Sequence, residues 1–503
     1  MRPLLDLFSN LAIGFATAAT PANLAFCLVG VVIGTLVGVL PGISPLTTVA
    51  MLLPFTFGLP PASALIMLSG IFYGAQYGGS TTAILVNVPG ETSSVITCID
   101  GHQMALQGRA GPALAIAAIG SFFAGTIATV AIALMSVPLA HFAMKFTAVE
   151  TVSLIVLGLI SAVVLAHGSV VKAILMIIVG VLLGLVGIDV NSGVPRMTFG
   201  LPQLADGIGF VPVAIGLFGI AEMIHNLGKP QDRALIDTRI SSLMPTRSDL
   251  RAAVPAILRG TGLGTVLGVL PGGGAALPAF AAYALEKKMA RDPSRFGKGA
   301  IEGVAGPESA NNAGAQTSFV PMLTLGIPSN PLMALMIGAL MIQGIQPGPQ
   351  VMTKQPELFW GVIASMWIGN LMLLVMNLPL ISLWVSLLRV PYRLLFPAIV
   401  ALCCIGAYSV SNNLFDVWLV LLFGLVGYLF IKIGVEPAPL VLGFVLGPML
   451  EENFRRAMLI SGGDMSTFVT RPISAVLLVL ALLLLAALLS PAIRARRDVL
   501  KEG

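Results

Sequence analysis

Long apolar segments recur along the chain almost to its end, separated by short polar or glycine- and proline-rich stretches. A membrane-spanning helix needs about 20 predominantly apolar residues. The pattern therefore predicts an all-α polytopic membrane protein with about 10–12 transmembrane helices. Plain apolar helices are expected near residues 112–138, 146–166, 169–188 and 208–225, and then near 357–388, 392–410, 414–432 and 472–490, with a further apolar stretch at 438–450.

The two halves of the chain share a sequence pattern. Residues 34–42 (GTLVGVLPG) match residues 264–272 (GTVLGVLPG) at seven of nine positions, at an offset of 264 − 34 = 230. A second pair follows in the same order, since NVPGE at 87–91 resembles GIPSN at 326–330, with the offset grown to 239. In each half an apolar helix runs into a Leu-Pro-Gly break, and a second proline break follows a polar stretch. The chain is therefore predicted to hold two structural repeats with broken helices and re-entrant hairpins.

The distribution of basic residues bears on how the repeats are oriented. The basic stretch 287–298 of the second half corresponds to the uncharged stretch 57–61 of the first, and basic loops mark the cytoplasmic side. This favours inverted repeats. Both halves end beside basic segments, which favours parallel repeats unless an extra N-terminal helix is present; we prefer inversion with that helix. The predicted units are a first membrane repeat (1–225), a basic cytoplasmic linker (226–252), a second membrane repeat (253–490) and a basic cytoplasmic tail (491–503).

The composition excludes other classes of protein. Of the 503 residues, 57% are hydrophobic and only 10% are charged, whereas a soluble protein is about 25% charged. Soluble, disordered and fibrous folds are thereby excluded. The net charge of +5 comes from basic residues gathered in a few loops, so no nucleic-acid partner is expected. The four cysteines lack metal-ligand spacing, so no structural metal is expected either.

The 55 glycines and 34 prolines are many for a helical membrane protein. Membranes retain them mainly where helices bend, break or pack closely. Paired breaks in two halves point to a transport site, because half-helix N-termini attract anions and unwound carbonyls bind cations. A single Pro-Gly break is more often a packing kink, but four breaks paired by repeat favour the binding role. The candidate substrate-binding residues at the breaks are Pro41, Gly42, Ser44, Pro89, Gly90, Pro271, Gly272, Gly273, Gly274, Pro328, Ser329 and Asn330.

Polar side chains also gather between the two breaks of each half. Amides and hydroxyls are costly in hydrocarbon, so they should face a cavity or one another. Neutral donors suit a carboxylate ligand, and carbonyl and hydroxyl oxygens suit Na⁺. The competing interpretation is hydrogen bonding between packed helices. The candidate substrate-binding residues in these stretches are Ser80, Thr81, Asn87, Asn311, Asn312 and Thr317.

Two acidic residues stand closest to the breaks. Glu91 and Glu308 either bind a coupling cation or proton, with Thr82 and Ser318 as further ligands, or cap a helix N-terminus. Asp100 follows in a polar loop and is expected at the surface. Loop ion pairs are expected among Asp189, Arg196, Glu451, Glu452, Arg455, Arg456 and Asp464.

Enzyme signatures do not occur in the sequence. It contains no HExxH, no nucleophile elbow and no phosphate-binding loop, so energy for transport must come from an ion gradient or another subunit. The alternatives to a transporter are an intramembrane enzyme that uses Glu308 or Asp464, and a passive anion channel. An enzyme should show an asymmetric catalytic constellation, whereas matching breaks in both halves favour a transporter.

Several long blocks resemble the TctA family, the large membrane subunit of tripartite tricarboxylate transporters. In order, the blocks are GVLPGISPLTTVAMLLPFTF, IFYGAQYGGSTTAILVNVPGE, GIDVNSGVPRMTFG, GVLPGGGAALPAF, GPESANNAGAQTSFVPMLTLGIPSN and GPMLEENFRRAML. The resemblance implies a secondary active importer of the bacterial inner membrane that takes up tricarboxylates such as citrate, or other organic carboxylates.

The same resemblance implies Na⁺ or H⁺ as the coupling ion, no other cofactor and no enzymatic activity. It also implies two partners, a small membrane subunit and a periplasmic substrate-binding protein, while a homodimer stays open. By analogy with other repeat transporters, an elevator-like core is expected to move against a scaffold of plain helices.

Overall fold

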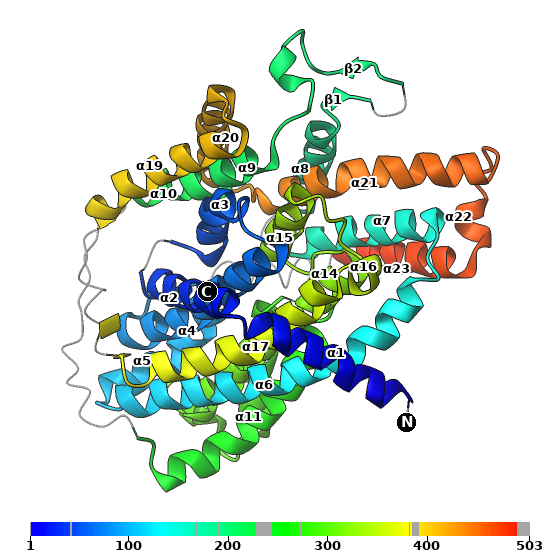
Figure 1. Cartoon of the computed structure of the whole chain (residues 1–503). Helices are drawn as coiled ribbons and strands as arrows, with labels where there is room; N and C mark the ends of the chain where they lie inside the picture. Colours follow the sequence, from blue (N-terminus) through cyan, green and yellow to red (C-terminus); the bar gives the residue numbers. More distant parts are fainter. Residues whose placement is uncertain are drawn as a thin grey trace.

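The computed structural model describes residues 2–40, 43–165, 169–189, 192–227, 244–270, 274–381, 383–384 and 392–489. Five predicted site residues lie outside the described residues, namely Pro41, Gly42, Pro271, Gly272 and Gly273, as do linker residues 228–243 and the tail. The described part is helical apart from one two-stranded hairpin (Figure 1). Five of its helices are long and apolar enough to cross a membrane, and six shorter helices are also apolar. An all-helical, multi-pass membrane protein is thereby confirmed.

A central group of long helices carries the predicted motifs. α4 and α13 are buried along almost their whole length, because α2, α11, α6 and α17 pack around them. The polar stretches therefore face protein and not lipid. The bounds are α1 (Arg2–Ala18), α2 (Pro21–Val39), α4 (Pro61–Val86), α6 (Ala110–Ala143), α11 (Arg247–Leu267), α13 (Glu302–Thr317) and α17 (Pro356–Asn377).

Rows of glycine let these central helices approach closely. In α2, a Cβ on Gly34 would lie 2.2 Å from the carbonyl oxygen of Ile71, and in α11 a Cβ on Gly264 would lie 2.4 Å from that of Ala310. Small residues four positions apart allow such backbone contact between membrane helices. The glycines one turn before and after repeat it, pairing Gly30 with Met67, Gly38 with Ala75, Gly260 with Gly306, and Gly268 with Gly314. Because the partner numbers rise together, α2 runs parallel to α4, and α11 to α13.

Short helices begin and end at the predicted breaks. Ser44 and Asn330 cap the helices that follow the first and last breaks, each with proline at the first helical position. Asn87 and Gly326 end the helices before the second break of each half in the left-handed conformation. The bounds are α3 (Pro45–Thr56), η1 (Thr92–Ser94), α5 (Val95–Leu106), α12 (Ala276–Met289), η4 (Pro293–Arg295), α14 (Phe319–Leu325), α15 (Pro331–Ile342) and α16 (Gln350–Lys354).

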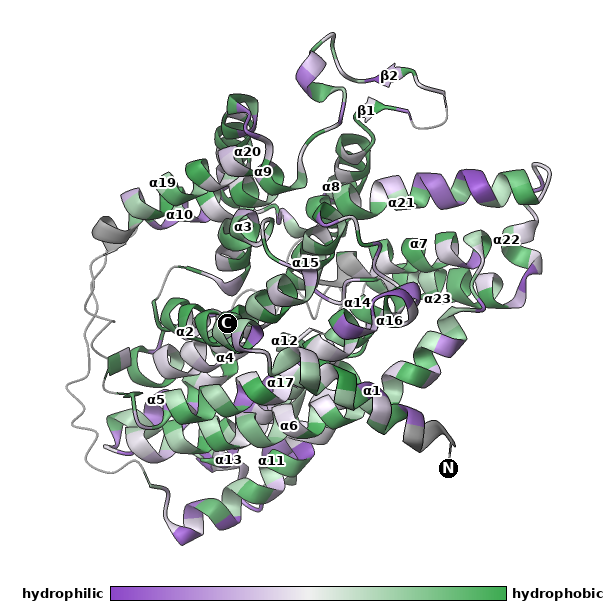
Figure 2. Cartoon of the chain, viewed as in Figure 1, coloured by the Kyte–Doolittle hydropathy of each residue, from purple (hydrophilic) through white to green (hydrophobic). Residues whose placement is uncertain are grey.

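The remaining helices form two groups outside the centre. One contains α9, η3, α10, α19 and α20, and the other contains α7, α8, α21 and α23 (Figure 1). Hydrophilic residues are conspicuous on the second half of α21, which extends beyond its apolar stretch (Figure 2). The bounds are α7 (Ala148–Leu165), α8 (Val170–Gly184), β1 (Gly187–Ile188), β2 (Pro195–Arg196), η2 (Pro202–Leu204), α9 (Phe210–Ala214), η3 (Ile215–Ile220), α10 (Ala221–Leu227), α19 (Tyr392–Ser411), α20 (Leu414–Lys432), α21 (Ala438–Ile460), α22 (Thr467–Thr470) and α23 (Pro472–Leu489).

Candidate functional site

Two carboxylates from different halves of the chain, the buried Glu308 and the half-buried Glu91, lie among the central helices. Glu308 of α13 is fully buried and accepts hydrogen bonds from Ser80 Oγ of α4 (2.6 Å) and Thr97 Oγ1 of α5. Glu91 follows the break after α4, where Ser93 Oγ donates to its carboxylate. Glu91 lies near Glu308, because a Cβ on Gly79 would be 3.6 Å from the Glu91 Cγ and the next residue, Ser80, donates to Glu308. Within the described residues, neither carboxylate pairs with a basic side chain.

Capping, the other role considered for these residues, applies to one of them. Glu91 is the N-cap of η1, whereas Glu308 lies inside α13 and caps nothing. The hydroxyls of Thr82 and Ser318, predicted as further ion ligands, donate instead to the backbone carbonyls of Gly79 (2.9 Å) and Gly314 (2.7 Å).

Amide side chains surround the carboxylate pair. Asn311 lies one turn after Glu308 on α13, and Ser93 Oγ, which bonds to Glu91, lies 3.3 Å from Gln76 Oε1. Both amide atoms of Asn311 and the Nε2 of Gln76 are buried without a partner among the residues that the structure describes. Since buried polar atoms are normally hydrogen-bonded, orphan donors and acceptors beside a carboxylate pair indicate a place for a ligand or water.

The cluster also contacts α6 well inside that helix. Asn312 Nδ2 donates to Ser121 Oγ at 2.7 Å. Ser121 is 11 residues from Ala110, where α6 begins, which corresponds to about 16 Å along the helix. A neighbouring cavity of about 10 Å³ has room for about one water molecule, so the site is closed to a carboxylate substrate in this conformation. Its polar lining comes from Tyr77, Ser80, Thr81, Ser121 and Asn377.

The N-terminus of α3, just after the first Leu-Pro-Gly break, holds a carboxylate of the chain itself. Ser44 Oγ donates to Glu222 Oε2 at 2.8 Å, and Thr47 Oγ1 donates to the same oxygen. Glu222 lies on α10 directly after the π-helical η3, and π-helical turns are frequent at functional sites. Glu222 is not among the residues predicted from the sequence, although an acidic residue in an apolar span is a signal for a site.

Other predicted residues lie around the breaks without reaching the carboxylate pair by hydrogen bonds. Asn87 and Pro89 are exposed at the end of α4, whereas Pro328 is buried. Gly90 packs against Gly79, where a Cβ would lie 2.6 Å from the Gly79 Cα. Gly274, at φ +50°, lies against Asn330.

Two hydroxyls in this region bond to backbone carbonyls, as the competing interpretation expects. Thr317 donates to Ala313 (3.0 Å), and Ser329 donates to Ser318 (3.2 Å).

Comparison with known proteins identifies the family. The model of the tripartite tricarboxylate transporter TctA family matches residues 24–442. The chain belongs to the TctA family. It is 59% identical over 495 residues (98% of this chain and 99% of the relative) to an uncharacterized 52.8 kDa protein in the TAR-I ttuC' 3' region of Agrobacterium vitis. It is 62% identical over 235 residues (47% of this chain and 97% of the relative) to an uncharacterized protein in the TAR-II ttuC' 3' region of the same organism. No solved structure matches it.

Membership in the TctA family makes the chain a component of a tripartite transporter for tricarboxylates, with other subunits, and not an enzyme. Asp464, a residue of the enzyme alternative, lies in an exposed turn after α21. Hydrogen bonds from the hydroxyl and backbone N–H of Ser466 hold the pKa of Asp464 below its ordinary value. Asp464 is therefore ionised, and its carboxylate is hydrogen-bonded to Ser466 within the same turn.

Loop ion pairs predicted for this TctA chain are present. Arg196 pairs with Glu451 (2.6 Å) and Arg455 with Asp189 (2.7 Å), which ties the β1–β2 hairpin to α21. Elsewhere on α21, the exposed pair Arg456 and Glu452 lies 2.9 Å apart. Asp464 forms no ion pair within the described part of the chain.

The expectation that Asp100 lies at the surface is wrong. It is fully buried, and its Oδ1 accepts from three backbone N–H groups of the segment 297–300 at 2.8–2.9 Å, while Oδ2 accepts from the Tyr283 hydroxyl at 2.9 Å. The loop that looks solvated in the sequence packs against one 197 to 200 residues away. Asp100 stands one turn after Thr97 on α5, so its hydrogen bonds fasten the helix that carries this donor to Glu308.

Asp100→Asn is expected to lower the free energy of unfolding by about 2 kcal/mol, because three charge-assisted hydrogen bonds become neutral ones. Thermal unfolding in detergent measures this. The matched control, Asp292→Asn, changes an exposed aspartate that bonds only to Ser294 and should leave the midpoint unchanged. Equal midpoints for both variants would remove the positioning role of Asp100.

Proposed function

We propose that this TctA subunit is a secondary active importer that moves a tricarboxylate or other organic carboxylate across the bacterial inner membrane with Na⁺ or H⁺. A periplasmic binding protein delivers the substrate, and a small membrane subunit completes the complex. The observation that carries the proposal is the Glu91–Glu308 pair. Glu308 is fully buried, Glu91 is half-buried, and neither has a basic partner among the described residues, so keeping both charged is costly and the pair holds a proton or binds a cation. A transporter can use that obligatory cation as its coupling ion.

The substrate site lies at the half-helix tips beside this pair. The start of α3 already binds the carboxylate of Glu222, through Ser44 and Thr47, and a substrate carboxylate offers the same chemistry. The unpartnered amide of Asn311 adds a neutral donor next to the coupling carboxylates. A substrate anion bound here is balanced by the cation that it brings, which explains why a buried lysine or arginine is not needed.

The two halves are inverted repeats. The glycine contacts support the repeat itself, because α2 corresponds to α11 at 264 − 34 = 230 and their partners correspond at 310 − 71 = 239, the two offsets found in the sequence. The first plain helices after the motifs, α6 and α17, run antiparallel. Trp367 Nε1 donates to the Thr126 carbonyl at 3.2 Å, and further along α17 Asn377 shares a cavity with Ser121. Corresponding helices of opposite direction are the property that defines inverted repeats.

An elevator-like movement follows from this division. The motif helices α2, α4, α11 and α13 pack on one another and on α6 and α17, while the other plain helices form the two outer groups. We assign the motif helices α2, α4, α11 and α13 to the moving core and the two outer groups to the scaffold. The helix α1, which packs on α17, is the extra N-terminal helix.

Asn311→Ala tests the substrate and ion site. Uptake of a labelled carboxylate in proteoliposomes supplied with the binding protein should fall about tenfold, the effect of one lost hydrogen bond to a charged group. Thermal stability should not fall, because the amide has no partner within the described residues. Asn453→Ala is the control, since its amide bonds only to the Met449 carbonyl on α21. Wild-type uptake by Asn311→Ala would exclude this residue from the site.

Independent Na⁺ and pH gradients identify the coupling ion in the same vesicles. Accumulation should require one gradient and stop when it is collapsed. Unchanged flux without either gradient would instead indicate a passive anion channel.

A further inference from the structure

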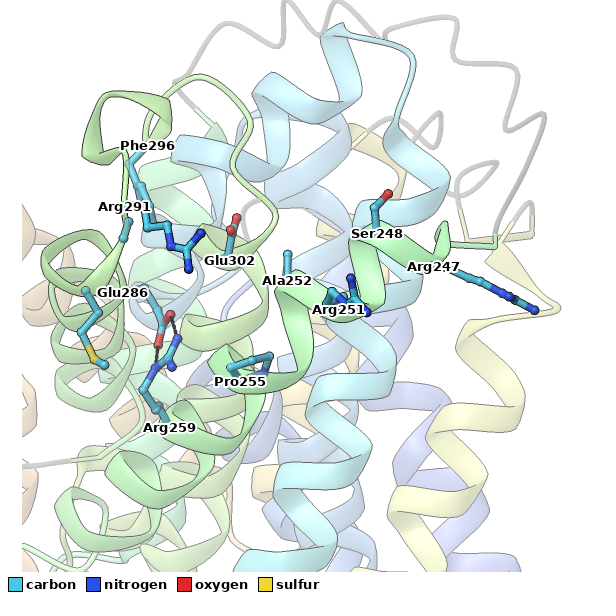
Figure 3. Close-up of a pocket in the computed structure, with 12 residues that line it drawn as sticks. Arg247, Ser248, Arg251, Ala252, Pro255, Arg259, Glu286, Arg291, Phe296 and Glu302 are labelled. Atoms are coloured by element: carbon cyan, nitrogen blue, oxygen red, sulfur yellow. Dashed lines mark hydrogen bonds and ion pairs between the residues drawn. The ribbon is translucent and has the colours of Figure 1, made fainter.

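A large basic pocket lies at the N-terminal end of α11, and none of its lining residues belongs to the carboxylate pair. Its volume is about 990 Å³. Side chains of α11 face those of α12 and the loop after it, and Arg259 and Glu286 are joined across it (Figure 3). The basic loops that border the pocket assign it to the cytoplasmic side.

The pocket carries uncompensated positive charge. Its two acids are already neutralised, because Glu286 accepts from Arg259 at 2.7 and 2.5 Å and Glu302 pairs with Arg295 at 3.2 Å. Three lining arginines have no acidic partner among the described residues, namely Arg247, Arg251 and Arg291. Arginine is suited to phosphate because its planar guanidinium can donate two parallel hydrogen bonds.

An apolar stripe continues from the pocket along the same face of α11. Positions 247, 251, 258, 262 and 266 follow one another at spacings of four or seven residues and so share one side of the helix. Leu258 and Val266 are 54% and 66% exposed. Gly262 between them leaves open space, since a Cβ there would have no neighbour within 4 Å. Charge at the helix end followed by an exposed apolar stripe matches a molecule with an anionic head and an acyl chain.

We propose that this pocket binds an anionic phospholipid of the cytoplasmic leaflet. Arg251 and Arg291 hold the phosphate, and an acyl chain lies over Gly262 between Leu258 and Val266. A free anion would use the arginines but gain nothing from the stripe. The apolar stripe therefore favours a lipid as the ligand over a soluble phosphate or carboxylate.

Native mass spectrometry of the full chain with phosphatidylglycerol or phosphatidylcholine tests the proposal. The wild type should retain phosphatidylglycerol in preference to phosphatidylcholine. Arg251→Gln with Arg291→Gln should weaken phosphatidylglycerol binding about 25-fold, from roughly fivefold per basic residue. Lys287→Gln with Lys288→Gln is the matched control, because it removes equal charge from the end of α12 without touching the pocket lining. The control should stay within about twofold of wild type.

Gly262→Trp separates a lipid from a free anion. The indole occupies the open space between Leu258 and Val266 without changing any charge and should weaken phosphatidylglycerol binding, while excess citrate or inorganic phosphate should not displace the lipid from the wild type. Thermal unfolding without lipid should be the same for all variants. Equal retention of the two lipids, equal affinities of the arginine and lysine variants, or displacement by free anions with no effect of Gly262→Trp would each overturn the proposal.

Discussion

Glu308→Gln is expected to abolish concentrative uptake of carboxylate, by at least about 100-fold, while the protein still exchanges substrate across the membrane. The glutamine keeps the size of the side chain, and its carbonyl oxygen can accept from one of the two hydroxyls, Ser80 or Thr97, while the other hydroxyl turns to accept from the new amide N–H, so the local packing survives. It cannot take up a proton or give a cation a full negative charge. The carrier is then fixed in the state that the cation normally produces, in which exchange continues and net cycling stops.

Two assays on one preparation measure this difference. Proteoliposomes with an imposed ion gradient report net uptake, and vesicles loaded with unlabelled substrate report exchange. Glu302→Gln on the same helix is the matched control, because Glu302 pairs with Arg295 near the start of α13 and should leave net uptake close to wild type. Gradient-driven uptake at the wild-type rate in Glu308→Gln would exclude Glu308 from coupling, and loss of exchange as well as uptake would indicate a purely structural role.

Local features of the chain were predictable from the sequence. α20 occupies Leu414–Lys432, the range expected from its apolar run, because the run and the length of a membrane span coincide there. The short helices at the breaks were also predictable, since Ser44 and Asn330 combine a capping side chain with a following proline. α21 runs ten residues past the apolar stretch that ends at 450, where i,i+4 pairs such as Arg455–Glu451 stabilise a polar helix.

Contacts between distant segments were not predictable in the same way. From the sequence alone, Asp100 is expected in a solvated loop. In the structure, a segment 197 to 200 residues away supplies three N–H donors to it. Glu222 sits in what looks like a plain apolar helix, and its role depends on a helix start 178 residues earlier. Neither contact can be predicted from the periodicity of apolar and polar residues in the sequence. The Glu91–Glu308 pair was found only as two separate candidates, because which polar residues of the two halves meet is decided by helix packing.

Gly264→Ala is expected to prevent the protein from folding. The added Cβ would lie 2.4 Å from the carbonyl oxygen of Ala310 and 2.8 Å from the Cβ of Ala313, so α11 and α13 must move apart. Backbone carbonyls inside a helix cannot shift aside as a flexible side chain can. Overpacking of this kind costs about 3 kcal/mol or more, and the close helix contacts one turn on either side, at Gly260 and Gly268, are lost with it. Purification should yield aggregated protein and no sharp thermal transition.

Gly262→Ala is a control on the same helix, because a Cβ two residues earlier meets nothing within 4 Å. Alanine has a higher helix propensity than glycine, by about 1 kcal/mol, so this variant should be as stable as wild type or slightly more stable. The contrast between two identical substitutions separates close approach from helix propensity. Gly34→Ala in the first half should behave like Gly264→Ala, since its Cβ would lie 2.2 Å from the Ile71 carbonyl oxygen. If Gly264→Ala and Gly262→Ala melted at the same temperature, α13 would not depend on contact with α11 to hold Glu308 in place.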